Sequence, residues 1–243
     1  MSLSYYVLYL HNKVQAREIY ACRGMILQMA SREWEAWHNH DLQSGRSLRR
    51  YPSIQYKILD YRLSVVALES EKKQLFDFAA QLPKWGSLNK QPVQLRFWKM
   101  HRFDTSFDLL PSFRFYRCDN FLPMKSEQYQ AYQRHCQEYE LPPDAPLIEH
   151  PKTRNFFAGL IKSRIVEQAQ SLGAYVDPDL LQIRLANSPI RHSLTTYYKE
   201  TRFSKLSELM FGVNLSWPVH LGLGFGVALG YGMLRPIKTM VTD

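Results

Sequence analysis

The order of strand-like and helix-like segments in the first hundred residues constrains the fold most. Residues 4–10, SYYVLYL, are rich in β-branched and aromatic side chains, which is typical of a strand. Between Val14 and Arg32, apolar residues recur at spacings of three and four, and this pattern predicts an amphipathic helix. Two short apolar runs, at 51–59 and 63–69, then predict a hairpin with a short turn.

A second helix and a further strand complete this pattern. Ser70 is a suitable cap for a helix that runs to about Leu82, and residues 92–103 predict another strand. The resulting order, β-α-β-β-α-β, is that of the ferredoxin-like sandwich, in which two helices cover one face of an antiparallel sheet. We therefore expect an α+β fold whose N-terminal domain is joined to the rest of the chain near residue 90.

The second half of the chain has a less regular pattern, but it also contains candidate helices and strands. Two helices are expected at about 126–139 and 153–172, and the four prolines between them prevent either helix from continuing. We expect a second α+β domain here, built as a degenerate copy of the first. Its strand candidates are residues 112–118, 181–187, 194–200, 205–213 and 231–238.

Charge and cysteine content limit the classes of partner. The chain has 31 Lys and Arg against 22 Asp and Glu, a formal net charge of +9, which favours a polyanion such as nucleic acid, with an acidic membrane surface second. Its three scattered cysteines, Cys22, Cys118 and Cys136, support neither a disulfide framework nor a zinc knuckle and fit a reducing cytoplasm.

Secretion and membrane insertion are not expected. The N-terminus lacks the cationic region, long apolar core and cleavage site of a signal peptide. The uncharged stretch from Leu221 to Leu234 is shorter than the roughly 18–20 apolar residues that a spanning helix needs, and its five glycines are a poor helix composition. We therefore expect a cytoplasmic protein with no membrane partner.

Glycines crowd the segment before the last expected strand. They follow the pattern G-x-G-x-G-x-x-x-G-x-G from Gly222 to Gly232, a density that lets backbone N–H groups approach a phosphate closely. The Gly-Lys-Ser/Thr ending of a P-loop is missing, and no βαβ unit can follow as a dinucleotide fingerprint requires. The segment is predicted to be either a backbone cradle for a polyanion or a structural turn.

This glycine-rich segment resembles the C-terminal glycine-rich loop of the CRISPR-associated RNA-processing endoribonucleases, which cleave repeats. The resemblance spans nearly the whole chain and implies two ferredoxin-like (RRM-like) domains in tandem, residues 1–90 and 91–243, with antiparallel sheets and helices on one face. Many members carry lysines or other polar residues inside the loop, whereas this chain has no cation there before Arg235. The other segments that carry the resemblance are His38-Asn39-His40, RRYPSIQYK at 49–57, NFLPMKSEQYQAY at 120–132 and FGVNLSWPVHLGLG at 211–224.

The histidine pair lies in the loop expected after the first helix. If the backbone is extended, His38 and His40 share a face, because side chains two apart point the same way. The neighbouring Glu35 and Asp41 form no recognised metal-ligand spacing with them, so neither a metal nor another cofactor is expected. Two solvated loop histidines would be the default reading of an arbitrary sequence. The resemblance instead implies a catalytic histidine in this loop.

The reaction that the resemblance implies is RNA cleavage without metal, in which the ribose 2′-OH attacks the adjacent phosphorus. Histidine suits the acid and base duties because its ordinary pKa near 6.5 allows either protonation state at neutral pH. His40 is the first candidate, with His38 as its partner or substitute. Tyr51 is predicted either to orient or donate a proton at this site or to be an ordinary strand aromatic.

The developing charge on phosphorus needs fixed cations. A basic row on the helix expected at 153–172 could also track phosphates, or it could be an ordinary solvated face. The predicted RNA contacts are the basic residues around the histidine loop and the glycine-rich segment with its following arginine: Arg32, Arg46, Arg49, Arg50, Lys57, Gly222, Gly224, Gly226, Gly230, Gly232 and Arg235.

We interpret the sequence as that of a metal-independent endoribonuclease that cleaves CRISPR precursor RNA within its repeats and leaves a 2′,3′-cyclic phosphate and a 5′-hydroxyl. Its expected partners are the precursor and mature guide RNA, with subunits of an effector complex as further candidates; a monomer and a homodimer are both compatible with the sequence. One alternative is a non-catalytic subunit that holds the guide's repeat hairpin. Another is an unrelated basic ferredoxin-like domain that binds protein or DNA.

Overall fold

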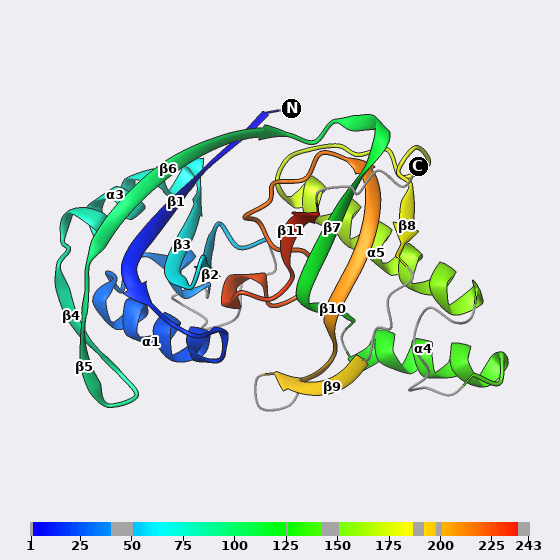
Figure 1. Ribbon diagram of the computed structural model, residues 1–243, viewed down its shortest axis with the longest axis horizontal. Helices are drawn as coiled ribbons and strands as arrows, with labels where there is room; N and C mark the ends of the chain where they lie inside the picture. Colours follow the sequence, from blue (N-terminus) through cyan, green and yellow to red (C-terminus); the bar gives the residue numbers. More distant parts are fainter. Residues whose placement is uncertain are drawn as a thin grey trace. The chain divides into compact units, whose positions relative to one another are not determined.

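The computed structural model describes residues 2–39, 51–124, 126–141, 151–186, 192–197 and 201–237 (Figure 1). The chain forms two compact units. The N-terminal unit consists of Ser2–Thr105 together with Val227–Gly230, and the C-terminal unit consists of Ser106–Gly226 and Tyr231–Asp243. The boundary expected at residue 90 falls in the turn of the β-hairpin at residues 84–95, and the N-terminal unit continues through two further strands, to Thr105.

The N-terminal unit has the expected β-α-β-β-α-β order. Its four-stranded sheet has the order β2-β3-β1-β6, so the last strand lies beside the first, as in a ferredoxin-like fold. The strand expected at 92–103 is divided at Arg96, and its first part forms a separate hairpin, β4-β5. The elements are β1 (Ser2–Lys13), η1 (Ala16–Glu18), α1 (Ile19–Met29), α2 (Glu35–His38), β2 (Ile54–Leu59), β3 (Arg62–Leu68), η2 (Glu69–Glu71), α3 (Lys72–Ala80), β4 (Lys84–Leu88), β5 (Gln91–Leu95) and β6 (Phe97–Ser106).

The core of this unit lies between the sheet and its helices. Tyr6, Leu8 and Leu10 alternate along β1 and pack in one cluster with side chains of α1 and α3, such as Ile26 and Phe78. The intervening residues of β1 are buried as well. Because both faces of the strand are covered, the sequence of β1 is a continuous apolar run and does not alternate between apolar and polar residues.

The C-terminal unit repeats this arrangement in a reduced form. Its sheet has the order β11-β7-β10-β8, with β9 paired to β10. As in the N-terminal unit, the last strand in the sequence, β11, lies beside the first, β7. Residues 216–232, all of which the structure describes, contain a 3-10 turn but no α-helix where a second copy would have one. The elements are β7 (Leu109–Met124), α4 (Ser126–Glu138), α5 (Pro151–Ser171), β8 (Ile183–Leu185), β9 (His192–Tyr197), β10 (Thr201–Leu215), η3 (Val227–Leu229) and β11 (Met233–Ile237).

These two antiparallel sheets confirm the predicted fold class, two ferredoxin-like domains in tandem. In the second domain, α5 buries Phe157, Ile161, Ile165 and Ala169, which recur every four residues and form one apolar stripe. Among the helices in the described part of the chain, none combines the length and the apolar character needed to cross a membrane.

Candidate functional site

The histidine loop begins at α2, a helix of a single turn that the N-terminal unit holds by its last carbonyl groups. Tyr56 Oη donates a hydrogen bond to Trp37 O at 3.0 Å, and Arg23 Nη2 donates one to His38 O at 2.8 Å. The Trp37 ring is fully buried, and its centroid lies 4.9 Å from that of Phe78. Helix C-terminal carbonyls have no partner within the helix, so these two donors fix the point from which the chain enters the loop.

The end of α2 turns the backbone sharply. Asn39 has a left-handed conformation with φ 55°, and its N–H donates to Glu35 O at 2.8 Å, which closes the helix. His38 is partly buried, and its Nε2 is buried without a hydrogen-bond partner among the described residues. His38 therefore does not present this nitrogen to solvent. The other predicted residues of the loop, His40, Arg46, Arg49 and Arg50, lie outside the described residues.

Tyr51 lies where the chain returns to the sheet, just ahead of β2. It is buried, and burial raises the pKa of its phenol, although a hydrogen bond with the Gln55 side chain acts in the opposite direction. The phenol is therefore protonated at neutral pH, a state in which it can donate a proton in a hydrogen bond but cannot act as a base.

Lys57 is a fully buried lysine on β2, although the sequence predicted an RNA contact for it. Its Nζ donates to Val227 O at 3.0 Å, and this carbonyl belongs to the η3 segment of the same N-terminal unit. A buried ammonium needs such a partner, because taking a charge out of water is costly. This geometry does not support a phosphate contact by Lys57. Arg32, in contrast, is exposed between α1 and α2, as an RNA contact requires.

The glycine-rich segment uses much of its backbone for hydrogen bonds within the protein. In the C-terminal unit, Gly232 N–H donates to Asp119 O at 3.1 Å, and Gly232 O accepts from Leu223 N–H at 2.8 Å. Phe225 N–H donates to Leu122 O at 2.9 Å. In the N-terminal unit, Gly230 N–H donates to Val227 O at 3.2 Å. Of the two readings left open by the sequence, this geometry favours the structural turn at these positions.

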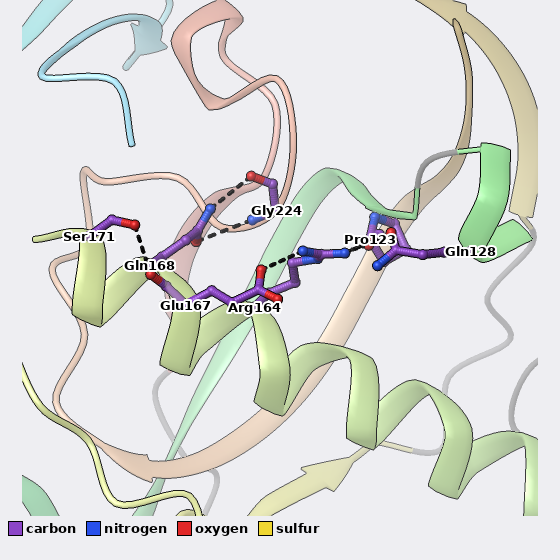
Figure 2. A network of polar contacts seen from close by, with 7 residues as sticks. All are labelled: Pro123, Gln128, Arg164, Glu167, Gln168, Ser171 and Gly224. Atoms are coloured by element: carbon purple, nitrogen blue, oxygen red, sulfur yellow. Dashed lines mark hydrogen bonds and ion pairs between the residues drawn. The ribbon is translucent and has the colours of Figure 1, made fainter. Parts of the chain in front are cut away.

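Helix α5 holds the same segment through side chains, as Figure 2 shows. Gln168 Nε2 donates to Gly224 O at 2.8 Å, and Gly224 N–H donates back to Gln168 Oε1 at 3.3 Å. One turn earlier, Arg164 Nε donates to Pro123 O at 3.0 Å, and its guanidinium carbon lies 4.2 Å from the ring centroid of Phe225. Two residues of α5 thus fix both the end of β7 and the glycine-rich segment.

The basic row expected along this helix is therefore not a simple phosphate track. Arg164 is buried and also pairs with Glu167 and Gln128. Arg154 Nη2 donates to Leu185 O at 2.8 Å. At the other end of the glycine-rich segment, Arg235 is half exposed and its Nε donates to Asp119 Oδ2 at 2.8 Å. Of the predicted RNA-binding cations that the structure describes, Arg32 and Arg235 thus lie at the surface and Lys57 is buried.

Two features of the site were not predicted from the sequence. Arg23 and Tyr56, which hold α2, were read only as members of a helix and a strand. Arg23 binds His38 and Tyr56 binds Trp37, and the residues of each pair lie on different elements of the chain. No local sequence pattern therefore indicated these contacts. Among the described residues, no group of three or more His, Cys, Asp or Glu is placed to hold a metal ion.

Comparisons with known proteins agree with the fold and with the resemblance carried by the sequence. Residues 1–106 match the family model of the Cas6b N-terminal domain. Among solved structures, a Cas6b crystal structure is 16% identical with a TM-score of 0.75, and a CRISPR RNA processing endoribonuclease Cas6b is 15% identical with a TM-score of 0.64. Csf5, a type IV Cas6 crRNA endonuclease, is 11% identical with a TM-score of 0.57. Each comparison covers 98% of this chain and 100% of the other.

At these identities the structural similarity shows the fold, and the family model adds a sequence match for the N-terminal domain. The resemblance to the CRISPR RNA-processing endoribonucleases is confirmed in that sense. No curated protein matches the chain.

We predict that Gly232→Ala destabilises the C-terminal unit. Gly232 has φ +65°, and a Cβ there would overlap the carbonyl group of Leu223. We expect a loss of about 1–3 kcal/mol in the free energy of unfolding, measured by chemical denaturation. Gly159→Ala on α5 is the control, because no atom beyond its neighbours and the backbone of its own helix lies within 4 Å of the added Cβ, and alanine favours a helix by about 1 kcal/mol over glycine. Equal effects of the two substitutions would contradict the prediction.

We predict that Gln168→Leu loosens the glycine-rich segment. The variant removes both hydrogen bonds to the buried Gly224, and each unpaired buried group costs about 1–3 kcal/mol. Hydrogen exchange followed by mass spectrometry should show faster exchange in peptides that cover residues 220–232. Ser171→Ala, on the next turn of α5, removes an exposed hydroxyl that bonds only Glu167 O of its own helix, and it should leave this exchange unchanged. Unaltered exchange in Gln168→Leu would show that the side chain does not hold the segment.

Proposed function

We propose that this chain, whose first 106 residues match the Cas6b N-terminal domain, is a metal-independent endoribonuclease that cleaves CRISPR precursor RNA within its repeats. Its products would be guide RNAs, each cut leaving a 2′,3′-cyclic phosphate and a 5′-hydroxyl. The protein would act in the cytoplasm and bind both the precursor and the mature RNA.

The observation that carries this proposal is the extent of the family match. It includes the whole segment from His38 to Lys57, in which the candidate catalytic residues lie. The geometry around that segment supports the same reading. The carbonyl groups of Trp37 and His38 are held by donors from β2 and α1, so His40 follows an anchored helix end by two residues. A catalytic group needs such anchoring, because small displacements are costly in rate.

The chemistry divides into two proton transfers. A base takes the proton of the 2′-OH, the resulting oxygen attacks phosphorus, and the bond from phosphorus to the 5′-oxygen breaks. An acid then supplies a proton to that 5′-oxygen. We assign His40 to one of these transfers, because an imidazole can serve as acid or base near neutral pH.

The structure limits the roles of the two other catalytic candidates, Tyr51 and His38. Tyr51 is protonated at neutral pH, since burial raises its pKa, so we assign it at most the role of a donor. His38 has a buried Nε2, which makes it a weaker candidate than His40 for contact with the ribose. We retain it as a partner that supports the reaction.

The negative charge that builds on phosphorus requires positive groups nearby. We assign this role to the arginines of the histidine loop, Arg46, Arg49 and Arg50, with exposed Arg32 at its N-terminal side. Lys57 is left out of this set, because its ammonium donates to Val227 O in the protein interior. The net charge of +9 supports binding of a polyanion.

We predict that substitutions in the loop separate cleavage from binding. His40→Ala should lower the single-turnover cleavage rate of a repeat RNA by roughly 10²–10⁴-fold, the usual effect of a positioned acid or base, with little change in RNA affinity. Arg49→Ala combined with Arg50→Ala should instead weaken affinity and can also lower the rate. His38→Ala should give an intermediate rate. Quenched-flow cleavage and filter binding measure the two quantities on the same RNA.

The result also separates the enzyme from its main alternative. If the wild-type protein binds repeat RNA tightly without cutting it, the chain is a non-catalytic RNA-binding subunit. If the double variant of His38 and His40 cleaves at the wild-type rate, the histidine mechanism is wrong and the catalytic group lies elsewhere.

A further inference from the structure

Aromatic and cationic side chains gather on the N-terminal unit at a place that the proposed site does not use. The group, here called the Trp98 cluster, consists of Tyr9 on β1, Arg62 at the start of β3, and Trp98, Lys99 and His101 on β6. Trp98 keeps 41% of its surface exposed. His101 is exposed and Lys99 and Arg62 are half buried.

The members of the cluster contact one another through their rings and charges. The guanidinium carbon of Arg62 lies 4.0 Å from the ring centroid of Trp98, and Lys99 Nζ lies 4.3 Å from it. Lys99 Nζ is also 4.8 Å from the ring centroid of Tyr9. The rings of Trp98 and His101 both meet Tyr9 edge to face, at centroid distances of 6.1 and 5.9 Å. Two cations are thus held on one exposed indole.

Neighbouring residues fix these side chains in place. Arg62 Nη1 donates to His11 O at 2.8 Å and lies 3.0 Å from His11 Nδ1. His11 is itself held by its N–H, which donates to Arg96 O at 2.8 Å. The Arg96 side chain is exposed and donates to Gln94 Oε1. Arg62 and His11 are therefore held in place before a ligand binds.

The charge around the cluster is predominantly positive. Arg62, Lys99 and Arg96 are cations. Asp60 is a carboxylate close enough to Tyr9 to raise the pKa of its phenol, whose burial acts in the same direction with the larger effect. Asp104, farther along β6, is paired with Arg102 and Ser4. The surface thus offers an excess of positive charge beside a flat aromatic ring.

We propose that the Trp98 cluster is a second RNA-binding surface, which takes single-stranded RNA with a base that replaces the Lys99 ammonium over the Trp98 ring and adjacent phosphates on Arg62 and the displaced Lys99. Single-stranded nucleic acids bind to this combination of aromatic platforms and cations without strict sequence preference. The inference rests on the proposed function for the identity of the nucleic acid. It adds a place where RNA that extends beyond the cleaved nucleotides is held.

The cluster is separate from the histidine site within the same unit. Tyr51 and Lys57 lie on or just before β2, which is one edge strand of the sheet in the order β2-β3-β1-β6. Trp98, Lys99 and His101 lie on β6, the opposite edge. Three strand spacings of about 4.8 Å separate the two edges, or about 14 Å. A substitution in the cluster can therefore be tested without altering the catalytic loop.

The test uses the full-length protein and a fluorescein-labelled oligouridylate of about 12 nucleotides, which has no secondary structure. We expect Trp98→Ala to weaken its binding by about 5- to 100-fold in fluorescence anisotropy, the usual range for losing one stacked base. Trp98→Phe, which keeps a ring, should restore most of the affinity. Phe97→Ala is the matched control, because Phe97 is the adjacent residue and is 49% exposed. It should change the affinity less than twofold.

A second readout separates this proposal from the function on which it rests. At protein concentrations that saturate a repeat RNA, Trp98→Ala should cleave at the wild-type single-turnover rate. Thermal unfolding verifies that Trp98→Ala and Phe97→Ala remain folded. If Trp98→Ala and Phe97→Ala bind oligouridylate equally well, the cluster is not an RNA surface and the proposal is overturned, whether or not the protein cleaves repeats. If the wild-type protein cuts no repeat but Trp98→Ala alone loses oligouridylate, the cluster stands and the proposed function fails.

Discussion

Two hydrogen bonds at the end of a single helical turn determine how this chain can present its histidine loop. A helix of four residues has no stability of its own, since its nucleation is unfavourable. It forms here because Trp37 is buried against the core, and because Tyr56 and Arg23 satisfy the carbonyl groups of Trp37 and His38. Burial raises the pKa of the Tyr56 phenol, which keeps its donor proton in place at neutral pH. The loop thus starts from rigid structure.

The glycine-rich segment is a structural element in both units. Residues 227–230 belong to the N-terminal unit, where Lys57 donates to Val227 O, and the flanking residues belong to the C-terminal unit, where Gln168 holds Gly224. Left-handed glycines make this path possible, because a side chain at Gly232 would overlap Leu223. The absence of a lysine in the segment, noted in the sequence, agrees with a role in packing.

The sequence predicted the fold well where local pattern and burial agree. Strand β1 contains the predicted apolar run of residues 4–10, and β2 and β3 form the predicted hairpin within 51–69. These segments were predictable because their apolar residues are the ones that the strands bury. The sequence did not reveal where a charged side chain is buried and hydrogen-bonded inside the protein. Lys57 was predicted to contact RNA, but its ammonium donates to a backbone carbonyl from a segment distant in the chain. Arg164, on a helix whose role the sequence left open, likewise donates to a distant carbonyl. Arg23 was also missed as a support of His38, because the two residues lie on different elements. The role of His40 stays a prediction.

The most direct measurement of the central claim is cleavage of a repeat RNA by the purified protein in excess EDTA, with one matched substrate that lacks a single 2′-OH. The all-ribose RNA should be cut at one position and give a 5′-hydroxyl and a 2′,3′-cyclic phosphate. The RNA with deoxyribose just before the scissile phosphate should remain intact, because the nucleophile is missing. Cleavage that requires added magnesium, or that leaves 5′-phosphate ends on both substrates, would contradict a histidine-dependent attack by the 2′-OH.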